Sequence, residues 1–226
     1  MEPTSAVSHN KVDAALSLFP GEFLTLSGAG QKVSVHVYRL LAKGAPVCLE
    51  DLAREADRPE EQVRRILREW PGVFYDDGGR IIGYWGLALP ETAHRFEVEG
   101  RILYTWCAWD SLFIPAILGK SARVETRCPE TGTAICLVVT PEGIADRQPT
   151  DIVMSFLDPE AAKIRENVML HFCHYVHFFG SHEAGSQWVS KHPGTYLLSI
   201  KDAYTLGRRK NEAQYQYLRD SKEIAE

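Results

Sequence analysis

The pattern of hydrophobic positions changes near residue 32 from irregular to helical. Residues 1–30 mix proline, serine and glycine with a few apolar positions and show no sustained period, so we interpret them as an N-terminal arm with at most one short helix. From Lys32 onward, the apolar residues that share one helical face are Val33, Val37, Leu40 and Leu41. Gly44 then supplies a stop signal. The spacing predicts a first helix between these two points.

Two shorter helical patterns and a strand pair follow. Residues 49–56 repeat apolar positions at steps of three and four residues. Pro59 opens another such stretch, whose inward positions are Val63, Ile66, Leu67 and Trp70. Residues 73–84 place aspartate and glycine between β-prone runs, which indicates a β-hairpin. Three helices followed by a hairpin predict a winged helix over residues 31–94.

Residues 95–226 alternate between strand-like and helical patterns. The strand-like runs are residues 124–126, 134–139 and 175–179, and the predicted helices include residues 186–189 and 199–207. Asp158 followed by Pro159 is typical of a helix start, with Asp158 as the cap. We predict an α+β fold class, in which a winged-helix-like helical domain precedes a mixed α/β domain with a largely antiparallel sheet.

Composition and charge limit the classes of partner. The chain has 226 residues, is 45% hydrophobic, and carries a formal charge of −5 with no long run of one sign. This balance argues against a nucleic-acid footprint or a polybasic membrane patch. No apolar run approaches the roughly 18 residues of a membrane helix, and the N-terminus lacks the pattern of a signal peptide. We expect a cytoplasmic protein whose partners are small molecules.

The charge of the last helix in the predicted winged helix is relevant to DNA binding. Within residues 60–70, three arginines are matched by three glutamates, and these six residues are Arg64, Arg65, Arg68, Glu60, Glu61 and Glu69. Non-specific affinity for a duplex comes mainly from neutralising phosphates, so a helix with balanced charge is poorly suited to recognition. We therefore expect no nucleic-acid partner.

The candidate chemistry lies in two cysteines and one aspartate. The five cysteines, at positions 48, 107, 128, 136 and 173, are odd in number and widely spaced, which favours free thiols. If Cys107, Asp110 and Cys173 come together, their two thiols and one carboxylate can hold a soft metal and move a proton. If residues 171–177 are extended, alternation places Cys173 on one face with His171, Tyr175 and His177.

Ordinary roles compete with this interpretation. A cysteine often packs as a small buried hydrophobe, and Asp110 can simply cap a helix that runs to about Gly119. Structural zinc is disfavoured because neither Cys128 nor Cys136 belongs to a CxxC pair. Histidines at positions 171, 174 and 177 are three apart, so on a strand they would point to both faces and not converge on a metal.

Several separated motifs resemble those of the organomercurial lyases, also called alkylmercury lyases, of bacterial mercury resistance. They occur in the same order over roughly residues 34–210, and they are RILYTWCAWD at 101–110, IPA at 114–116, ARV at 122–124, CPETG at 128–132, CHYVHFF at 173–179 and WVSKH at 188–192. Two departures stand out: His174 occupies a position where relatives carry a second cysteine, and Trp109 replaces a smaller aliphatic residue.

The resemblance implies a winged-helix-like domain that no longer serves DNA recognition, followed by a catalytic α/β domain. It aligns Cys107 and Cys173 with the two catalytic cysteines and Asp110 with the catalytic aspartate, and Cys128 with a structural cysteine. The implied reaction is protonolysis of the carbon–mercury bond to hydrocarbon and Hg(II), without a cofactor. External small thiols would support turnover, and mercuric reductase would accept the Hg(II).

The chemistry of the three side chains agrees with those roles. Thiolates are the softest protein ligands, and two of them on one mercury push electron density onto the bonded carbon. A thiol that binds mercury releases its proton, which Asp110 can collect and pass to that carbon as a general acid. The neighbouring aromatic residues would either wall off water around an apolar organic group or belong to the ordinary core, and these are Tyr104, Trp106, Trp109 and Phe178.

Two other functions stay open at this point. A metal-sensing winged-helix transcription regulator would explain a winged helix beside metal-binding thiols, but it does not explain Asp110, and it predicts a basic face. A cysteine hydrolase that pairs Cys107 with a histidine predicts cleavage of esters or amides without metal. Turnover of an organomercurial would separate both from the lyase.

Overall fold

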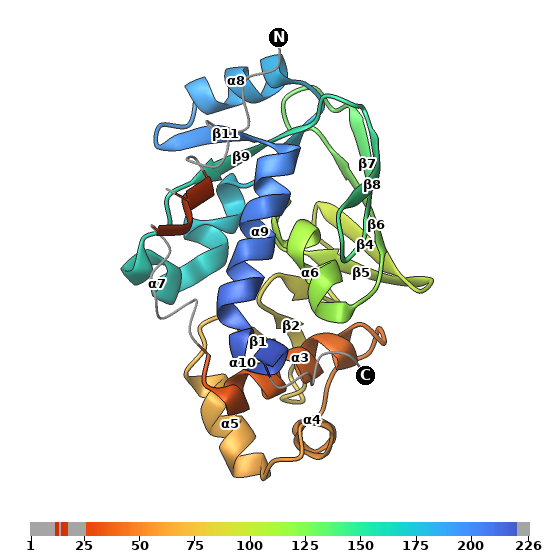
Figure 1. Cartoon of the computed structure of the whole chain (residues 1–226), viewed down its shortest axis with the longest axis vertical. Coiled ribbons are helices and arrows are strands. Elements are labelled where there is room, and N and C mark those ends of the chain that lie inside the picture. The colour runs from red at the N-terminus through yellow and green to blue at the C-terminus, as the bar shows by residue number, and fades with distance from the viewer. Residues whose placement is uncertain (1–11, 14, 18–25, 221–226) are drawn as a thin grey trace.

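A computed structural model describes residues 12–13, 15–17 and 26–220 of the chain. The N-terminal region contains α3 (Gly28–Leu41), α4 (Leu49–Glu55) and α5 (Glu60–Arg68), followed by the antiparallel strands β1 (Val73–Tyr75) and β2 (Ile81–Tyr84). Three helices and a hairpin are the order that the sequence predicts. In Figure 1 this region forms the lower end of the molecule.

The first helix begins earlier than its apolar spacing predicts. Ser27 caps α3, because its hydroxyl accepts a hydrogen bond from the backbone N–H of Gly30 at 3.1 Å. Residues 28–30, which we assigned to the arm, are therefore its first turn. Gly44 lies at φ 81°, in the left-handed region that ends helices, so the predicted stop is confirmed. Most of the predicted arm, at residues 1–11, 14 and 18–25, lies outside the described residues.

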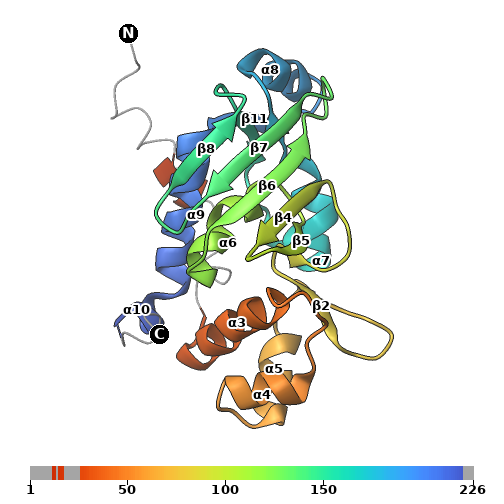
Figure 2. The same ribbon diagram turned by 90° about the vertical axis from the view of Figure 1, so that its right-hand side faces the viewer.

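A long antiparallel sheet joins the hairpin to the rest of the chain. Its strand order is β1-β2-β3-β5-β4-β6-β7-β8, so the N-terminal hairpin forms one edge. The further strands are β3 (Leu87–Ala88), β4 (His94–Val98), β5 (Arg101–Thr105), β6 (Ala122–Arg127), β7 (Ala134–Val139) and β8 (Ile144–Gln148). Burial alternates along β4, β6 and β7, as expected when one face of each strand packs on a core. Figure 2 shows α6 (Asp110–Leu118) and α9 (Ile200–Gln214) on one side of this sheet.

A second, smaller antiparallel sheet has the strand order β10-β9-β11. Its strands are β9 (Val153–Leu157), β10 (Phe178–Phe179) and β11 (Thr195–Ser199), and the remaining helices are α7 (Ala161–His171), the 3₁₀ turn η1 (Cys173–Tyr175), α8 (His182–Ser190) and α10 (Gln216–Asp220). Both sheets are antiparallel, and helices and strands are not regularly alternated. The predicted α+β class with a largely antiparallel sheet is confirmed.

The segment around Cys173 is not the extended strand that alternation predicts. The helix α7 ends at His171, Cys173–Tyr175 is a 3₁₀ turn, and only Phe178–Phe179 forms a strand. Ser155 stabilises this turn, since its hydroxyl donates to the carbonyl of Tyr175 at 2.7 Å and accepts from the N–H of His177 at 3.0 Å. The face assignment for residues 171–177 was therefore wrong, because a side chain from a distant strand satisfies the backbone groups that a strand partner would otherwise bind.

The predicted helices of the C-terminal region differ from the structure mainly in their bounds. The helix α7 begins at Ala161, so Asp158 does not cap it, and Asp158 instead accepts a hydrogen bond from the Tyr196 hydroxyl at 3.0 Å. The helices predicted at residues 186–189 and 199–207 exist as α8 and α9, and both extend further. Ser199 caps α9 through a hydrogen bond from the N–H of Asp202.

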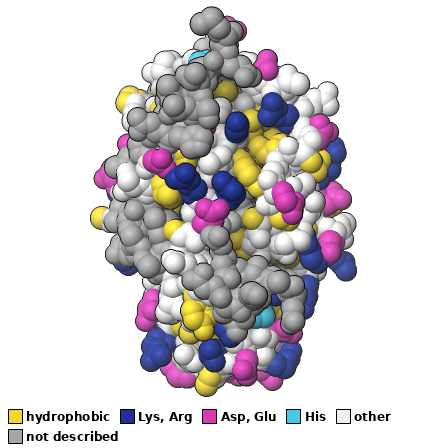
Figure 3. Space-filling view, in the orientation of Figure 1, with side chains coloured by type: hydrophobic (Ala, Val, Ile, Leu, Met, Phe, Trp, Pro, Cys, Tyr) yellow, Lys and Arg dark blue, Asp and Glu magenta, His cyan; other side chains and the backbone are white. Residues whose placement is uncertain are grey.

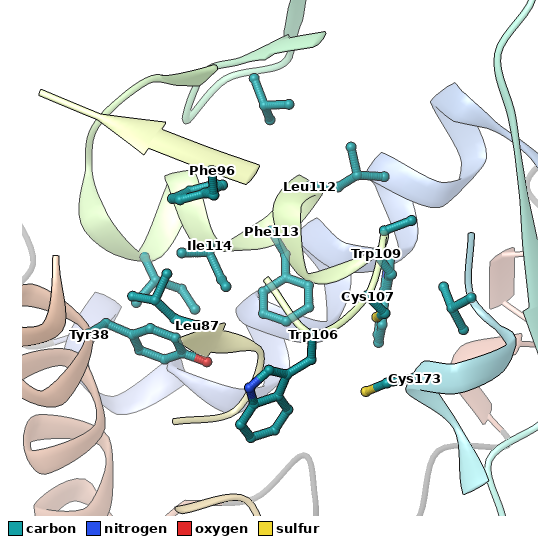
Figure 4. Packing of buried hydrophobic residues seen from close by; sticks show 14 of the residues in the cluster. Tyr38, Leu87, Phe96, Trp106, Cys107, Trp109, Leu112, Phe113, Ile114 and Cys173 are labelled. Carbon is teal, nitrogen blue, oxygen red and sulfur yellow. The ribbon is translucent and has the colours of Figure 1, made fainter. Parts of the chain in front are cut away.

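The buried apolar residues of both regions form one continuous cluster. Figure 4 shows part of it, with Tyr38 of α3 on one side and Phe113 and Trp109 near α6 on the other. On the surface, positive and negative side chains are interspersed over the described part of the face in Figure 3. Within the described residues, no helix combines the length and apolar character needed to cross a membrane.

Candidate functional site

Cys107 and Asp110 lie at the junction between β5 and α6. Asp110 is the first residue of α6, and its Oδ2 accepts a hydrogen bond from the backbone N–H of Cys107 at 2.9 Å. Thr105 and Ser111 hold the intervening turn, because their hydroxyls donate to the carbonyls of Cys107 at 3.1 Å and Ala108 at 2.7 Å. The Asp110 carboxylate thus binds the backbone three residues before the start of the helix and not the helical N–H groups, so the simple capping role does not describe it.

Cys173 comes to this junction from the turn η1. The backbone N–H of Ala108 donates to the carbonyl of Val176 at 3.1 Å, which ties the two cysteine segments together. The sulfurs of Cys107 and Cys173 and a carboxylate oxygen of Asp110 lie within 4.8 Å of one another, and all three residues are buried. Figure 4 shows Cys107 and Cys173 on these neighbouring segments. The three residues singled out from the sequence are therefore brought together.

Gly86, between β2 and β3, lies directly against the side chain of Asp110. Its carbonyl accepts a hydrogen bond from the N–H of Trp106 at 2.9 Å, and its φ of 98° is one that side-chain-bearing residues rarely adopt. A Cβ atom at this position would lie 2.4 Å from Cγ of Asp110. The Tyr38 hydroxyl, on α3, donates to the carbonyl of Trp85 at 2.7 Å and fixes the same turn. The N-terminal region therefore helps to place the catalytic candidate.

A cavity of about 40 Å³ opens beside Cys173 and Asp110. Its walls are mainly apolar, with aromatic rings from Trp85, Trp106, Trp109, Phe113 and Phe172 and aliphatic groups from α7. The indole N–H of Trp109 donates to the carbonyl of Ala203 at 3.1 Å, which fixes that ring. Of the four aromatic residues considered from the sequence, Trp106 and Trp109 line this cavity, whereas Tyr104 and Phe178 do not.

Burial changes the ionisation of the three candidates. Burial raises the pKa of the Cys107 thiol well above its ordinary value, and its hydrogen bond with Cys173 acts in the same direction. A hydrogen bond with Cys107 lowers the pKa of Cys173, but burial and the negative charge of Asp110 together outweigh it, so the net shift of the Cys173 pKa is upward. Burial also raises the pKa of Asp110 to about 6, although hydrogen bonds from Cys107 oppose the change. At neutral pH the site therefore holds two thiols and one carboxylate.

Lys210 is a further ionisable group of this cavity that the sequence interpretation missed. Its side chain is buried on α9 and lines the cavity with Asp110 and Cys173. Burial lowers the pKa of Lys210 to about 7, although the charge of Asp110 acts to raise it. A signal was present in the sequence, because Lys210 continues the three- and four-residue spacing of the buried positions of α9, which include Ala203, Leu206 and Gly207.

The other cysteines and the histidines lie apart from this cluster. Among the described residues, no second group of three or more potential ligands meets the same geometric criterion. Cys48 is exposed, Cys136 is half-buried, and Cys128 is buried in its own turn. The His177 ring lies within hydrogen-bonding distance of the His174 carbonyl, at 2.8 Å. The cluster of described residues around Cys107 contains no histidine, so a cysteine–histidine hydrolase lacks support.

Comparison with known families gives a consistent result. The family model described as alkylmercury lyase matches residues 87–211, and the model described as the helix-turn-helix domain of alkylmercury lyase matches residues 25–85. The alkylmercury lyase of Staphylococcus epidermidis is 38% identical over 199 residues, which cover 85% of this chain and 90% of that protein. The enzyme of the same name from Streptomyces lividans is 43% identical over 175 residues, covering 77% of this chain and 80% of the relative.

A third relative and a solved structure extend the comparison. The alkylmercury lyase of Pseudomonas putida is 42% identical over 188 residues, which cover 83% of this chain and 84% of the relative. A crystal structure of the mercury-bound form of MerB2 superposes with a TM-score of 0.67, covering 92% of this chain and 98% of that one. Its sequence identity is 19%, so this similarity bears on the fold.

Proposed function

The chain belongs to the alkylmercury lyase family, which cleaves the bond between carbon and mercury, and from that premise we propose that Cys107, Cys173 and Asp110 perform the cleavage. The observation that carries these roles is the convergence of two sulfurs and a carboxylate oxygen within 4.8 Å in a buried site. Such a donor set suits a soft metal and a proton transfer together.

Substrate binding begins with thiol exchange. The substrate, R–Hg–X, loses X as the Cys107 sulfur bonds to mercury, and the Cys107 proton passes to the Asp110 carboxylate. The Cys173 proton leaves with X as HX, so the second thiolate can bind the same mercury. The backbone N–H of Cys107 at 2.9 Å and the side-chain hydrogen bond with Cys107 hold Asp110 within reach of the first proton.

Cleavage then requires a proton at the carbon bonded to mercury. The two thiolates raise the electron density on that carbon, and protonated Asp110 donates its proton to it. The electron pair of the carbon–mercury bond forms the new C–H bond, and mercury remains as Hg(II) on the two sulfurs. The carboxylate of Asp110 is regenerated.

The walls of the cavity support this chemistry by excluding water. Trp106, Trp109 and Phe113 surround the site with apolar surface, which suits the organic group R. In a dry site the proton of Asp110 is not lost to solvent before it reaches carbon. Because Trp109 fills space on one wall, it is the residue that would limit the size of R.

We extend the proposal to the surroundings of the enzyme. Small external thiols remove Hg(II) from the two cysteines and allow turnover, mercuric reductase accepts the product, and the reaction takes place in the cytoplasm without a cofactor or nucleic acid. We also propose a division into an arm at residues 1–30, a winged-helix-like domain at 31–94 and a catalytic domain at 95–226. The family models that match residues 25–85 and 87–211 support that division.

The direct test is hydrocarbon release. We expect the protein, incubated with phenylmercury and an excess of a small thiol, to release benzene and to continue through many turnovers. Cys48→Ser is the matched control, because this thiol is exposed and apart from the cluster, and its activity should equal that of the wild type. Benzene formation that is no faster than with the small thiol alone would contradict the proposal.

A further inference from the structure

Lys210 is a buried cation in the substrate cavity. Lys210 is only 5% exposed, its Nζ lies 3.9 Å from the centre of the Phe113 ring, and the same Nζ donates a hydrogen bond to the Asn211 side-chain oxygen at 3.3 Å. Its neighbours on α9, Arg208 and Arg209, form ion pairs, whereas Lys210 has none among the residues that the structure describes. Burying a charged lysine away from water without an ion-pair partner lowers the stability of the folded protein. A functional role for the charge would explain why such a residue is present.

The net charge of the site is zero only when a positive charge on Lys210 is included. In the resting site the two thiols are neutral, so the Asp110 carboxylate leaves one net negative charge. With R–Hg⁺ bound, two thiolates, one organomercury cation and protonated Asp110 again leave one. After cleavage, Hg(II) and its two thiolates are neutral and the carboxylate is restored, so one negative charge remains. Lys210 cancels that charge in all three states when it is protonated, and the negative charge of Asp110 favours the protonated form against burial.

We propose that Lys210 is a positioning residue whose ammonium keeps the closed site neutral throughout the reaction and thereby permits both thiolates to bind one mercury. This inference rests on the proposed roles of Cys107, Cys173 and Asp110. The cavity places Lys210 on the same walls as Asp110 and Cys173, where a charge is weakly screened. Asp110 is the charged group whose field acts on Lys210 across this space.

Removing the charge should affect cleavage more than binding. Without Lys210, the neutral arrangement is one thiolate on R–Hg⁺ with Cys173 still protonated and Asp110 protonated. That arrangement binds the organomercurial, but it lacks the second thiolate that activates the carbon. A neutral side chain at position 210 should therefore give a protein that captures phenylmercury and releases benzene slowly.

The experiment is a single-turnover measurement with protein in excess over phenylmercury. We expect Lys210→Met to bind phenylmercury at wild-type stoichiometry and to release benzene at least about tenfold more slowly. Lys210→Arg, which keeps the charge, should stay within about threefold of the wild type. Lys201→Met is the matched control, since Lys201 is exposed on the same helix, and it should release benzene at the wild-type rate.

Circular dichroism and a thermal melt check that each variant is folded, and Lys210→Gln replaces Lys210→Met if the latter does not fold. Wild-type benzene release in the neutral variant would overturn the inference, as would Lys210→Arg being as slow as Lys210→Met, because packing would then explain the effect. Failure of the wild-type protein to release benzene would instead overturn the proposed catalytic roles.

Discussion

Charged residues are exposed on α5 of the helix-turn-helix region, residues 25–85, and buried in the cavity that contains Asp110. On α5, Arg64, Arg65 and Arg68 are exposed, and the Arg64 contact with Glu61 is long, at 3.9 Å. Exposed charges of this kind are well solvated and contribute little to stability or chemistry. In the cavity, Asp110 and Lys210 are buried, and burial moves the pKa of Asp110 up to about 6 and that of Lys210 down to about 7. Desolvation, and not the number of charges, distinguishes the charged groups of the cavity from those on the surface of α5.

The two regions nevertheless share one structural element. The turn that follows β2 carries Trp85 and Gly86 into the wall of the cavity, and Tyr38 of α3 binds its backbone. We therefore expect the helix-turn-helix region to affect the site through the shape of this turn and not through its surface charge. Changes in the two regions should have effects that differ widely in size.

The largest effects are expected at the two sulfurs. Cys107→Ser and Cys173→Ser should each reduce benzene release from phenylmercury below detection, because oxygen is a hard and poor ligand for mercury. Cys128→Ser is a useful comparison, since Cys128 is also buried but lies outside the cluster, and the folded variant should remain active. Gas chromatography of released benzene measures all three. Full activity in Cys173→Ser would refute the two-thiolate mechanism.

Asp110→Asn should come next. The amide cannot deliver an acidic proton, so the rate of carbon–mercury cleavage should fall by about 10²–10⁴-fold, while phenylmercury binding is retained. Mercury content after gel filtration measures binding, and single-turnover benzene release measures cleavage. A variant that fails to retain phenylmercury would assign Asp110 to substrate binding in place of proton transfer.

Gly86→Ala tests the element that links the two regions. The new Cβ would lie 2.4 Å from Asp110 Cγ, and φ 98° is strained for alanine, so the carboxylate or the turn must shift. We expect kcat/KM to fall about tenfold or more, because small misplacement of a catalytic group is costly. Gly79→Ala, also at positive φ but with no atoms near the added Cβ, is the control for backbone strain alone. Equal losses in both variants would exclude a specific effect on Asp110.

The pH dependence should be moderate. Asp110 must be a carboxylate to receive the thiol proton, and its pKa of about 6 means that kcat/KM should fall about tenfold per pH unit below that value. The contribution of Asp110 to folding stability should change with pH in the opposite direction. A carboxyl whose folded pKa is raised contributes stability below its unfolded pKa near 3.8, and this contribution is lost as pH rises through about 6. If the fall of kcat/KM at low pH coincided with a loss of thermal stability, this assignment to Asp110 would be contradicted.

The smallest effect is expected on the surface of α5. Replacing Arg64 and Arg68 with alanine should change benzene release by less than about twofold, because both side chains are exposed and their charges are well solvated. A gel-shift assay with duplex DNA should show no binding by the wild type at physiological salt. DNA binding that these substitutions abolish would restore a regulatory role for the region.

The sequence predicted those features that depend on local pattern. The helices α3–α5, the hairpin of β1 and β2, and strand β7 follow apolar periodicity and turn residues. The conformation of Cys173 could not be predicted in this way, because Ser155 of a distant strand stabilises its turn. The chemistry of their side chains singles out Cys107 and Cys173, and the resemblance aligns them with catalytic cysteines, whereas their approach is accompanied by a tertiary hydrogen bond between Ala108 and Val176.

Gly86 and Lys210 show the same limit in the site itself. A glycine in a turn has an ordinary explanation until the structure places Asp110 against it. Lys210 continued an apolar spacing, which signals burial, but only the fold reveals that it lines the cavity with Asp110. Local sequence carries residue type and periodicity, and it does not carry the distances between segments.

In the proposed mechanism, Cys107 and Cys173 bind the same mercury and both still hold it as Hg(II) after cleavage. X-ray absorption at the mercury edge, recorded on the wild-type protein after one turnover with phenylmercury and without added thiol, tests it most directly. We expect two protein sulfur ligands on each mercury and one benzene released for each mercury bound. Complete benzene release with mercury held by a single protein sulfur would contradict it.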